Sequence, residues 1–137
     1  AYGQAKTANA LFALALDMKF SDQGLRAFSV HPGGIMTPLQ RHLPQEEMQA
    51  LGWLDENGEI SERVKAMFKS PTQGCTTSLW AATSAALGDA GGLYCEDCDV
   101  ADPATDDSPR YRDVSAHAVN EESAQRLWQV TETMLAQ

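Results

Sequence analysis

The sequence is short of basic residues and has no long apolar segment, and each shortage excludes a class of partner. Ten Lys and Arg stand against 19 Asp and Glu, which gives a formal net charge of −9 at pH 7. A field of that sign repels polyanions, so we expect neither nucleic acid nor an anionic membrane surface as a partner. The longest apolar run, Ala10–Leu16, is far shorter than the roughly 20 residues that cross a bilayer.

Cysteine is also scarce, and its pattern argues against a secreted protein. The chain has three cysteines, an odd number, and it opens at Ala1 without a basic and apolar leader. Reduced thiols in the cytoplasm are therefore the expectation. Because the first residue is not Met, we also expect the natural protein to begin further upstream.

Cys95 and Cys98 form a Cys-x-x-Cys pair, which in other settings binds zinc or exchanges disulfides. A zinc ion needs about four ligands. The other candidate ligands lack the spacing of a zinc finger: Cys75, His31, His42 and His117. Glu96 and Asp97, between the two cysteines, oppose thiolate formation. The sequence therefore predicts no metal site and no redox role for the pair.

Local patterns predict an α/β fold in one domain of 137 residues. Residues 2–20 are rich in Ala and Leu, contain no Pro, and are typical of a helix. Gly24 fits the end of that helix, and residues 25–31 form a strand that Pro32 terminates. A helix, a tight turn and a strand in this order indicate a parallel sheet. The apolar residues of the helix go nearly all the way round, so we expect contacts with the sheet and with a second subunit of a homo-oligomer.

The rest of the chain alternates helices with a short strand and loops. Residues 38–71 are predicted to leave the sheet as an excursion that contains polar helical pieces. The expected elements, in chain order, are helices at 45–51, 61–69 and 71–87, a strand at 93–95, a surface loop at 97–113 and a helix at 120–135.

Tyr2 and Lys6 are four residues apart at the start of the first helix, so their side chains share one helical face. A phenol ordinarily keeps its proton up to about pH 10. A neighbouring ammonium favours the phenolate, and such a pair can serve as a general acid for a carbonyl or a general base for an alcohol. The same spacing occurs by chance in many helices, so the pair alone is weak evidence.

Together with its surroundings, the pair resembles the Tyr-x-x-x-Lys motif of the short-chain dehydrogenase/reductase family. In that family the motif begins a helix that is followed by a strand ending in Pro-Gly, as His31-Pro32-Gly33 does here at matching spacing. The resemblance covers essentially the whole chain and points to the branch of retinol dehydrogenase-like and WW-domain oxidoreductase-like proteins. The segments that indicate this branch are His31-Pro32-Gly33, Trp80-Ala81-Ala82-Thr83, Gly91-Gly92-Leu93-Tyr94 and Arg126-Leu127-Trp128.

The resemblance implies the C-terminal portion of a doubly wound Rossmann-type parallel sheet with flanking helices. The Gly-rich dinucleotide loop and the catalytic serine of the family would lie before Ala1, in an N-terminal half that this sequence does not contain. Residues 1–137 would therefore be the catalytic and substrate-side segment, inactive without the missing half as a partner.

The resemblance also implies roles for individual residues. Tyr2 would pass a proton to or from the substrate oxygen, and Lys6 would bind the nicotinamide ribose and favour the phenolate of Tyr2. The other positions that would contact NAD or NADP are Pro32, Gly33, Ile35 and Thr37. Residues 38–71 stand where the family carries its substrate loop, and three of them are candidate lid residues, although ordinary packing explains these equally well: Leu39, Leu43 and Trp53.

The resulting prediction is an NAD(P)-dependent oxidoreductase that interconverts an alcohol and a carbonyl of a small molecule. The alternative is a non-catalytic interaction or regulatory module on the same scaffold. His31, at the predicted strand end, is interpreted as a buried histidine bonded to backbone rather than a catalytic base. Residues 1–137 indicate neither whether the cofactor is NAD or NADP nor which substrate is used.

Overall fold

The computed structural model describes residues 1–109 and 112–136 and divides the chain into two compact units. The sheet unit comprises Ala1–His31 and Thr77–Gln137, and the inserted unit comprises Pro32–Thr76. The predicted excursion at 38–71 lies within the inserted unit, and the predicted loop at 97–113 includes two residues outside the described ranges. No helix among the described residues is long and apolar enough to span a membrane.

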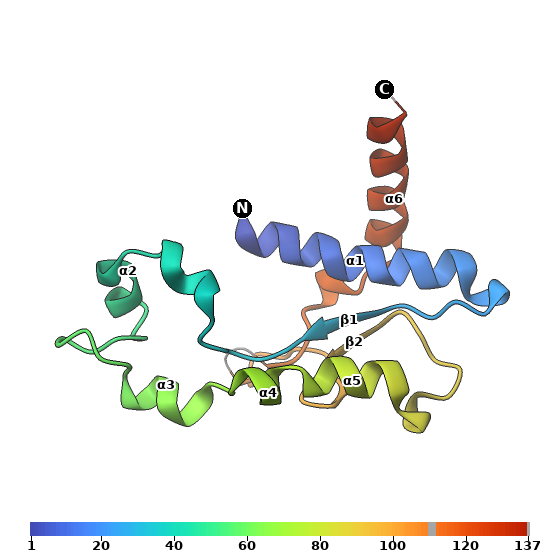
Figure 1. The fold of residues 1–137 in the computed structure, drawn as a ribbon. Helices are drawn as coiled ribbons and strands as arrows, with labels where there is room; N and C mark the ends of the chain where they lie inside the picture. Colours follow the sequence, from blue (N-terminus) through green and yellow to red (C-terminus); the bar gives the residue numbers. More distant parts are fainter. Residues whose placement is uncertain (110–111, 137) are drawn as a thin grey trace. The chain divides into compact units, whose positions relative to one another are not determined.

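A three-stranded sheet forms the centre of the sheet unit (Figure 1). β1 (Phe28–His31) pairs with β2 (Leu93–Glu96) in parallel along its whole length. β3 (Asp99–Val100) pairs with β2 in antiparallel fashion, so the strand order is β1-β2-β3 and the sheet is mixed. The α/β class and the parallel pair agree with the prediction, whereas the sequence predicts a loop where β3 lies.

The loop prediction is wrong at residues 99–100 because a tight turn follows β2. Asp97 and Cys98 both have positive φ angles, 49° and 60°, as in a two-residue hairpin turn. Gly usually occupies the second position of such a turn, so Cys98 provides no sequence signal. The backbone N–H of Cys98 donates to the hydroxyl of Thr77 at 3.2 Å and holds the turn. The Cys-x-x-Cys pair therefore spans a strand end and a hairpin turn.

α1 (Tyr2–Phe20) packs on the sheet and has the predicted bounds. Its buried positions are Ala10, Leu11, Ala13 and Ala15. Phe12 is 49% exposed, so the sheet unit covers only part of the apolar surface of this helix. The helix ends through a short 3-10 turn and Gly24, whose φ of 79° is the left-handed conformation expected of a helix stop.

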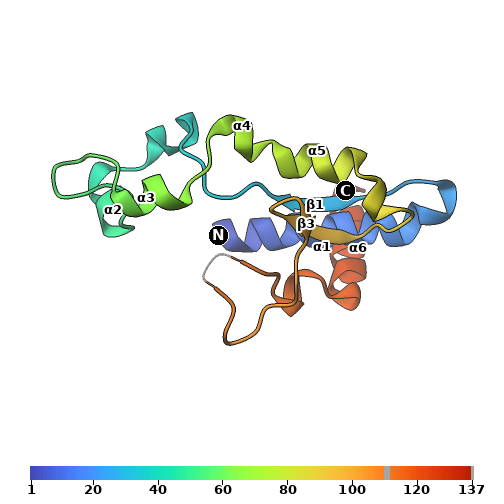
Figure 2. The ribbon, with the colours of Figure 1, turned by 90° about the horizontal axis from the view of Figure 1, so that it is seen from below.

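α6 (Glu121–Leu135) packs across α1 (Figures 1 and 2). Asn120 caps the helix, because its side chain accepts the backbone N–H of Ser123 at 2.8 Å. Ala124 is fully buried in a cluster with residues of α1. The ring of Trp128 stacks on that of Phe12, with centroids 5.6 Å apart and planes 8° from parallel. The helix predicted at 120–135 is confirmed, and Ala124, Leu127 and Trp128 on it pack against α1.

The single helix predicted at 71–87 is wrong, because this range forms three short pieces. They are α4 (Pro71–Gly74), α5 (Thr76–Thr83) and a 3-10 turn, Ala85–Leu87. Ser84 ends α5, since its backbone is extended and its side chain caps the turn that follows. Figure 1 shows α5 on the opposite side of the sheet from α1, and Thr77 on α5 is buried. Helices therefore flank both faces of the sheet.

The inserted unit consists of short helices around a small apolar centre. Its helices are the 3-10 turn Pro38–His42, α2 (Gln45–Ala50), α3 (Glu62–Met67) and α4. These positions agree with the helical pieces predicted at 45–51 and 61–69. Val64 is 3% exposed, and the rings of Trp53 and Phe68 meet edge to face with centroids 5.8 Å apart.

Candidate functional site

Tyr2 and Lys6 lie close together at the N-terminal end of α1. The Nζ atom of Lys6 is 5.3 Å from the centroid of the Tyr2 ring, within the range of a cation–π contact. Tyr2 is 72% exposed, and Ala1, which precedes the helix, provides no side-chain cap. The two side chains thus share one face of the helix, and the phenol is open to solvent.

A cavity of about 180 Å³ lies beside Lys6 within the sheet unit. Its walls come from α1, β2 and residues 113–118. The lining residues are Gly3, Lys6, Thr7, Ala10, Tyr94, Asp113, Val114, Ser115, His117 and Ala118. Burial, together with the nearby carboxylate of Glu96, raises the pKa of Tyr94, so this phenol keeps its proton at neutral pH. Lys6 therefore contacts an exposed phenol and also lines a cavity of mixed polar and apolar character.

Pro32, Gly33 and Ile35 begin the inserted unit in a tightly packed segment. Gly33 has a φ of +87°, and a Cβ at this position would lie 3.0 Å from the side chain of Lys69. Ile35 forms an isolated β-bridge with Lys69 and packs on Gly74, where a Cβ would collide with it. The local backbone therefore requires glycine at position 33, independently of any cofactor.

Thr37 caps the 3-10 turn Pro38–His42. Its hydroxyl accepts the backbone N–H of Leu39 at 3.3 Å and donates to Oε1 of Gln40 at 3.1 Å. Oε1 of Gln40 in turn accepts the backbone N–H of Thr37 at 2.7 Å, which completes a capping box. The hydroxyl thus has a structural role, and its contact with a cofactor stays a prediction.

The three candidate lid residues differ in their surroundings within the inserted unit. Leu39 is 68% exposed, Leu43 is half-buried, and Trp53 packs edge to face on Phe68. Trp53 therefore has an ordinary packing role, whereas Leu39 presents an apolar side chain to solvent. The substrate-loop role of this segment stays a prediction.

The predicted site residues form two groups in the structure. Tyr2 and Lys6 belong to the sheet unit. The other group lies in the inserted unit and comprises Pro32, Gly33, Ile35, Thr37 and the three lid residues. A single site that contains both groups stays a prediction.

Sequence reasoning missed a charged cluster around Glu96, the last residue of β2. Glu96 is 6% exposed, and its carboxylate accepts the backbone N–H of Asp113 at 2.8 Å. Nδ1 of His31 lies 3.8 Å from the same carboxylate, and the side chain of His31 is 38% exposed. The prediction of a buried His31 is therefore wrong, and the group beside it is a carboxylate. An acid at the end of a short apolar strand is the signal that could have revealed this cluster.

Cys95 does not have the features of a reactive thiol. Cys95 is completely buried, and this burial, with the carboxylate of Asp99, raises the pKa of its thiol. A raised thiol pKa disfavours the thiolate that redox exchange requires. In residues 1–109 and 112–136, no three His, Cys, Asp or Glu side chains are grouped so as to hold a metal ion.

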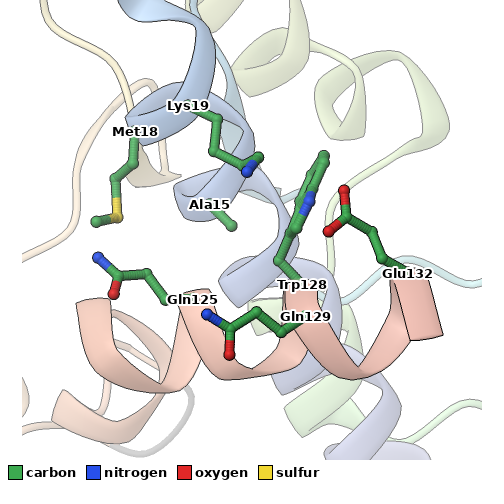
Figure 3. Close-up of a pocket in the computed structure, with 7 residues that line it drawn as sticks. All are labelled: Ala15, Met18, Lys19, Gln125, Trp128, Gln129 and Glu132. Atoms are coloured by element: carbon green, nitrogen blue, oxygen red, sulfur yellow. The ribbon is translucent and has the colours of Figure 1, made fainter.

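A larger cavity, of about 290 Å³, lies between the C-terminal half of α1 and α6 (Figure 3). Lys19 extends from α1 toward the indole of Trp128, and its Nζ lies 5.2 Å from the ring centroid. Nε1 of Trp128 is buried without a hydrogen-bond partner among the described residues. None of the predicted site residues lines this cavity, so it is separate from Tyr2 and Lys6.

Comparison with known proteins finds relatives along nearly the whole chain. The chain is 37% identical over 129 residues to a protein named probable oxidoreductase from Streptomyces lividans, covering 94% of this chain and 42% of the relative. It is 34% identical over 135 residues to the short-chain dehydrogenase/reductase prx1 of Penicillium roqueforti, covering 98% and 38%. It is also 34% identical over 131 residues to retinol dehydrogenase 11 of Homo sapiens, covering 96% and 34%. The chain thus spans about two fifths of the length of the first of these relatives. No family model and no solved structure matches it.

Proposed function

Because the chain belongs to the short-chain dehydrogenase/reductase family, in its retinol dehydrogenase-like branch, we propose that it is part of an NAD(P)-dependent oxidoreductase. The reaction would interconvert an alcohol and a carbonyl of a small molecule. The observation that carries the proposal is the Tyr2–Lys6 pair, with the ammonium 5.3 Å from the ring centroid and the phenol 72% exposed.

Tyr2 would move the proton of the reaction. In the reducing direction its hydroxyl donates a proton to the carbonyl oxygen, and in the oxidising direction the phenolate accepts the proton of the alcohol. The ammonium of Lys6, 5.3 Å from the ring centroid, would offset the negative charge that develops on the Tyr2 oxygen during proton transfer. When bound, NAD(P) supplies or accepts the hydride at the substrate carbon. The exposure of Tyr2 leaves its hydroxyl within reach of a substrate.

Lys6 also suits a contact with the ribose of the cofactor. It forms no ion pair with any described residue, so its ammonium keeps donors for ribose hydroxyls. In the inserted unit, Pro32, Gly33 and Ile35 would line the nicotinamide, and Thr37 would reach its carboxamide or the pyrophosphate. The cofactor would be NAD or NADP.

A further part of the domain would extend the sheet from β1. The strand order leaves β1 at an edge, where its outer backbone groups can pair with another strand. The chain spans 42% of the Streptomyces lividans relative, so the rest of the domain would supply the dinucleotide-binding half and complete a doubly wound sheet. The chain by itself would then not turn over substrate.

Exposed apolar side chains on α1 and α6 support assembly into a homo-oligomer. Phe12 is 49% exposed, and Met134 and Leu135 near the end of α6 are 70% and 82% exposed. Apolar surface of this kind favours burial against another chain. The homo-oligomer would use these two helices as part of its interface.

The function can be tested by joining residues 1–137 to the dinucleotide-binding half of the Streptomyces lividans relative. Oxidation of NADPH and NADH is then followed with aldehydes and ketones. Tyr2→Phe removes the hydroxyl and should lower kcat by about 10²–10⁴-fold, as expected for loss of a general acid. Unchanged turnover in the Tyr2→Phe protein would rule out the mechanism.

Lys6→Met provides a second arm with a matched control. Loss of the ammonium should lower kcat and weaken cofactor binding together, because Lys6 serves both the phenolate and the ribose. Lys19→Met, on the same helix, removes a lysine that contacts Trp128 instead. This control protein should keep the kcat and the cofactor affinity of the parent. Equal losses in the two variants would contradict the assigned role of Lys6.

A further inference from the structure

Glu96 is a buried charged side chain that the proposed chemistry does not use. It ends β2 and is 6% exposed, although an ionised carboxylate is costly to bury without partners. Neither Tyr2 nor Lys6 contacts it through a hydrogen bond or ion pair among the described residues. Its partners therefore determine what it does.

The end of β1 and one loop supply the partners of Glu96. Oε1 accepts the backbone N–H of Asp113 at 2.8 Å, and Nε of Arg112 lies 4.0 Å from the same oxygen. Nδ1 of His31 lies 3.8 Å from Oε2. Arg112 is shared, because its guanidinium also lies 3.5 Å from the carboxylate of Asp97. The bond from Asp113 is the short, directional contact of this group.

That bond acts on a backbone position that is unfavourable without it. Asp113 has a φ of 65°, in the left-handed region that a residue with a Cβ enters at a cost. The next residue, Val114, donates its N–H to the carbonyl of Asp102 at 2.9 Å and is 7% exposed. Glu96 therefore fixes the turn from which residues 113–118 continue.

Residues 113–118 form one wall of the cavity beside Lys6. Asp113, Ser115 and His117 line this space of about 180 Å³ together with Lys6 itself. Lys6 is an exposed residue, and this wall covers only the part of its side chain that faces the cavity, so a displacement of the wall would open that part as well. The carboxylate of Glu96 is thus linked to Lys6 through one short segment of backbone.

We propose that Glu96 is a positioning residue that holds residues 113–118 against the Lys6 side of α1 and so sets the reactivity of Lys6. The influence of Glu96 on an alcohol–carbonyl reaction rests on the proposed function. The influence of Glu96 on the reactivity of the Lys6 amine is independent of that function, and it can be measured on residues 1–137.

The test compares Glu96→Ala with Glu96→Gln. Gln keeps an acceptor oxygen for the N–H of Asp113, whereas Ala removes it. Amide hydrogen exchange is measured at residues 113–118, and the acylation rate of each lysine is measured by mass spectrometry, with Lys19 on α1 as the internal control. Glu96→Ala should speed exchange at 113–118 about tenfold, as expected when one charge-assisted hydrogen bond is lost. It should also raise acylation of Lys6 severalfold relative to Lys19. In the Glu96→Gln protein, both the exchange rate and the acylation ratio should stay close to those of the parent.

An unchanged ratio of Lys6 to Lys19 acylation in Glu96→Ala would overturn the proposal. Equal acceleration of exchange in α1, β1 and residues 113–118 would also overturn it, because that result reports general destabilisation. If Glu96→Ala does not fold, Glu96→Asp gives the same test, since the shorter side chain withdraws the carboxylate from Asp113. Activity of the Tyr2→Phe protein is measured separately, so the two proposals can fail independently.

Discussion

Gly33 adopts a φ of +87°, a conformation that residues with a Cβ enter only at a cost. We expect Gly33→Ala to lower the free energy of unfolding by about 1–2 kcal/mol, because of this angle and the nearby side chain of Lys69. Urea denaturation provides the measurement. Gly3→Ala is the control, since a Cβ there meets no atom within 4 Å and the residue lies in a helix. Equal stability of the Gly33→Ala protein and its parent would show that the angle is not retained in solution.

Cys95 is expected to be the least reactive of the three thiols. Burial and the carboxylate of Asp99 raise its pKa, so its thiolate forms only above the pH at which an ordinary thiol ionises. Cys75 is exposed and serves as the reference. Alkylation followed by mass spectrometry from pH 7 to 10 should show Cys75 labelled well before Cys95 at every pH. Because the folded-state pKa is raised, stability should fall as the pH rises past the ordinary thiol pKa.

At the scale of the secondary-structure elements, α6 depends on its cap. The side chain of Asn120 accepts the N–H of Ser123 at 2.8 Å, so Asn120→Ala should destabilise the protein by about 1 kcal/mol. Asn120→Asp keeps the acceptor and should remain close to the parent. The exchange rate of the Ser123 amide and the urea midpoint check both variants. A similar loss in the two proteins would assign the effect to something other than the cap.

The helices and strands also show which local sequence signals are enough to predict the bounds of an element. α1 has the bounds predicted from its Ala- and Leu-rich sequence, because helix propensity and the stop at Gly24 are local properties. β3 was missed, because Cys98 takes a left-handed conformation that depends on a hydrogen bond to Thr77, 21 residues away in sequence. The helix predicted at 71–87 is interrupted for a comparable reason, since Ser84 bonds to the backbone in place of continuing α5.

At the scale of the whole molecule, the open edge of β1 makes a measurable prediction. The carbonyl of Ala27 accepts the N–H of Gly92 at 2.8 Å, so backbone groups alternate along β1 and those of Phe28 and Val30 point to the open edge. Joining the dinucleotide-binding half should slow amide exchange at Phe28 and Val30 by about tenfold or more, as expected of amides newly placed inside a sheet. Ser29, which points to β2, is the control and should change little. No slowing at Phe28 and Val30 would contradict the extension of the sheet from β1.

The sequence by itself determined the α/β class, the extent of α1 and α6, the parallel pairing of β1 and β2, and the Tyr2–Lys6 pair. The helix bounds and the Tyr2–Lys6 pair depend on residues a few positions apart, and the parallel pairing was expected from the order of helix, turn and strand along the chain. Only the tertiary structure decided the burial of Glu96, the left-handed turn at Asp113 and the wall beside Lys6. The contact that joins them links residues 17 positions apart, and no local period specifies such a contact, because it exists only once strand and loop have packed together.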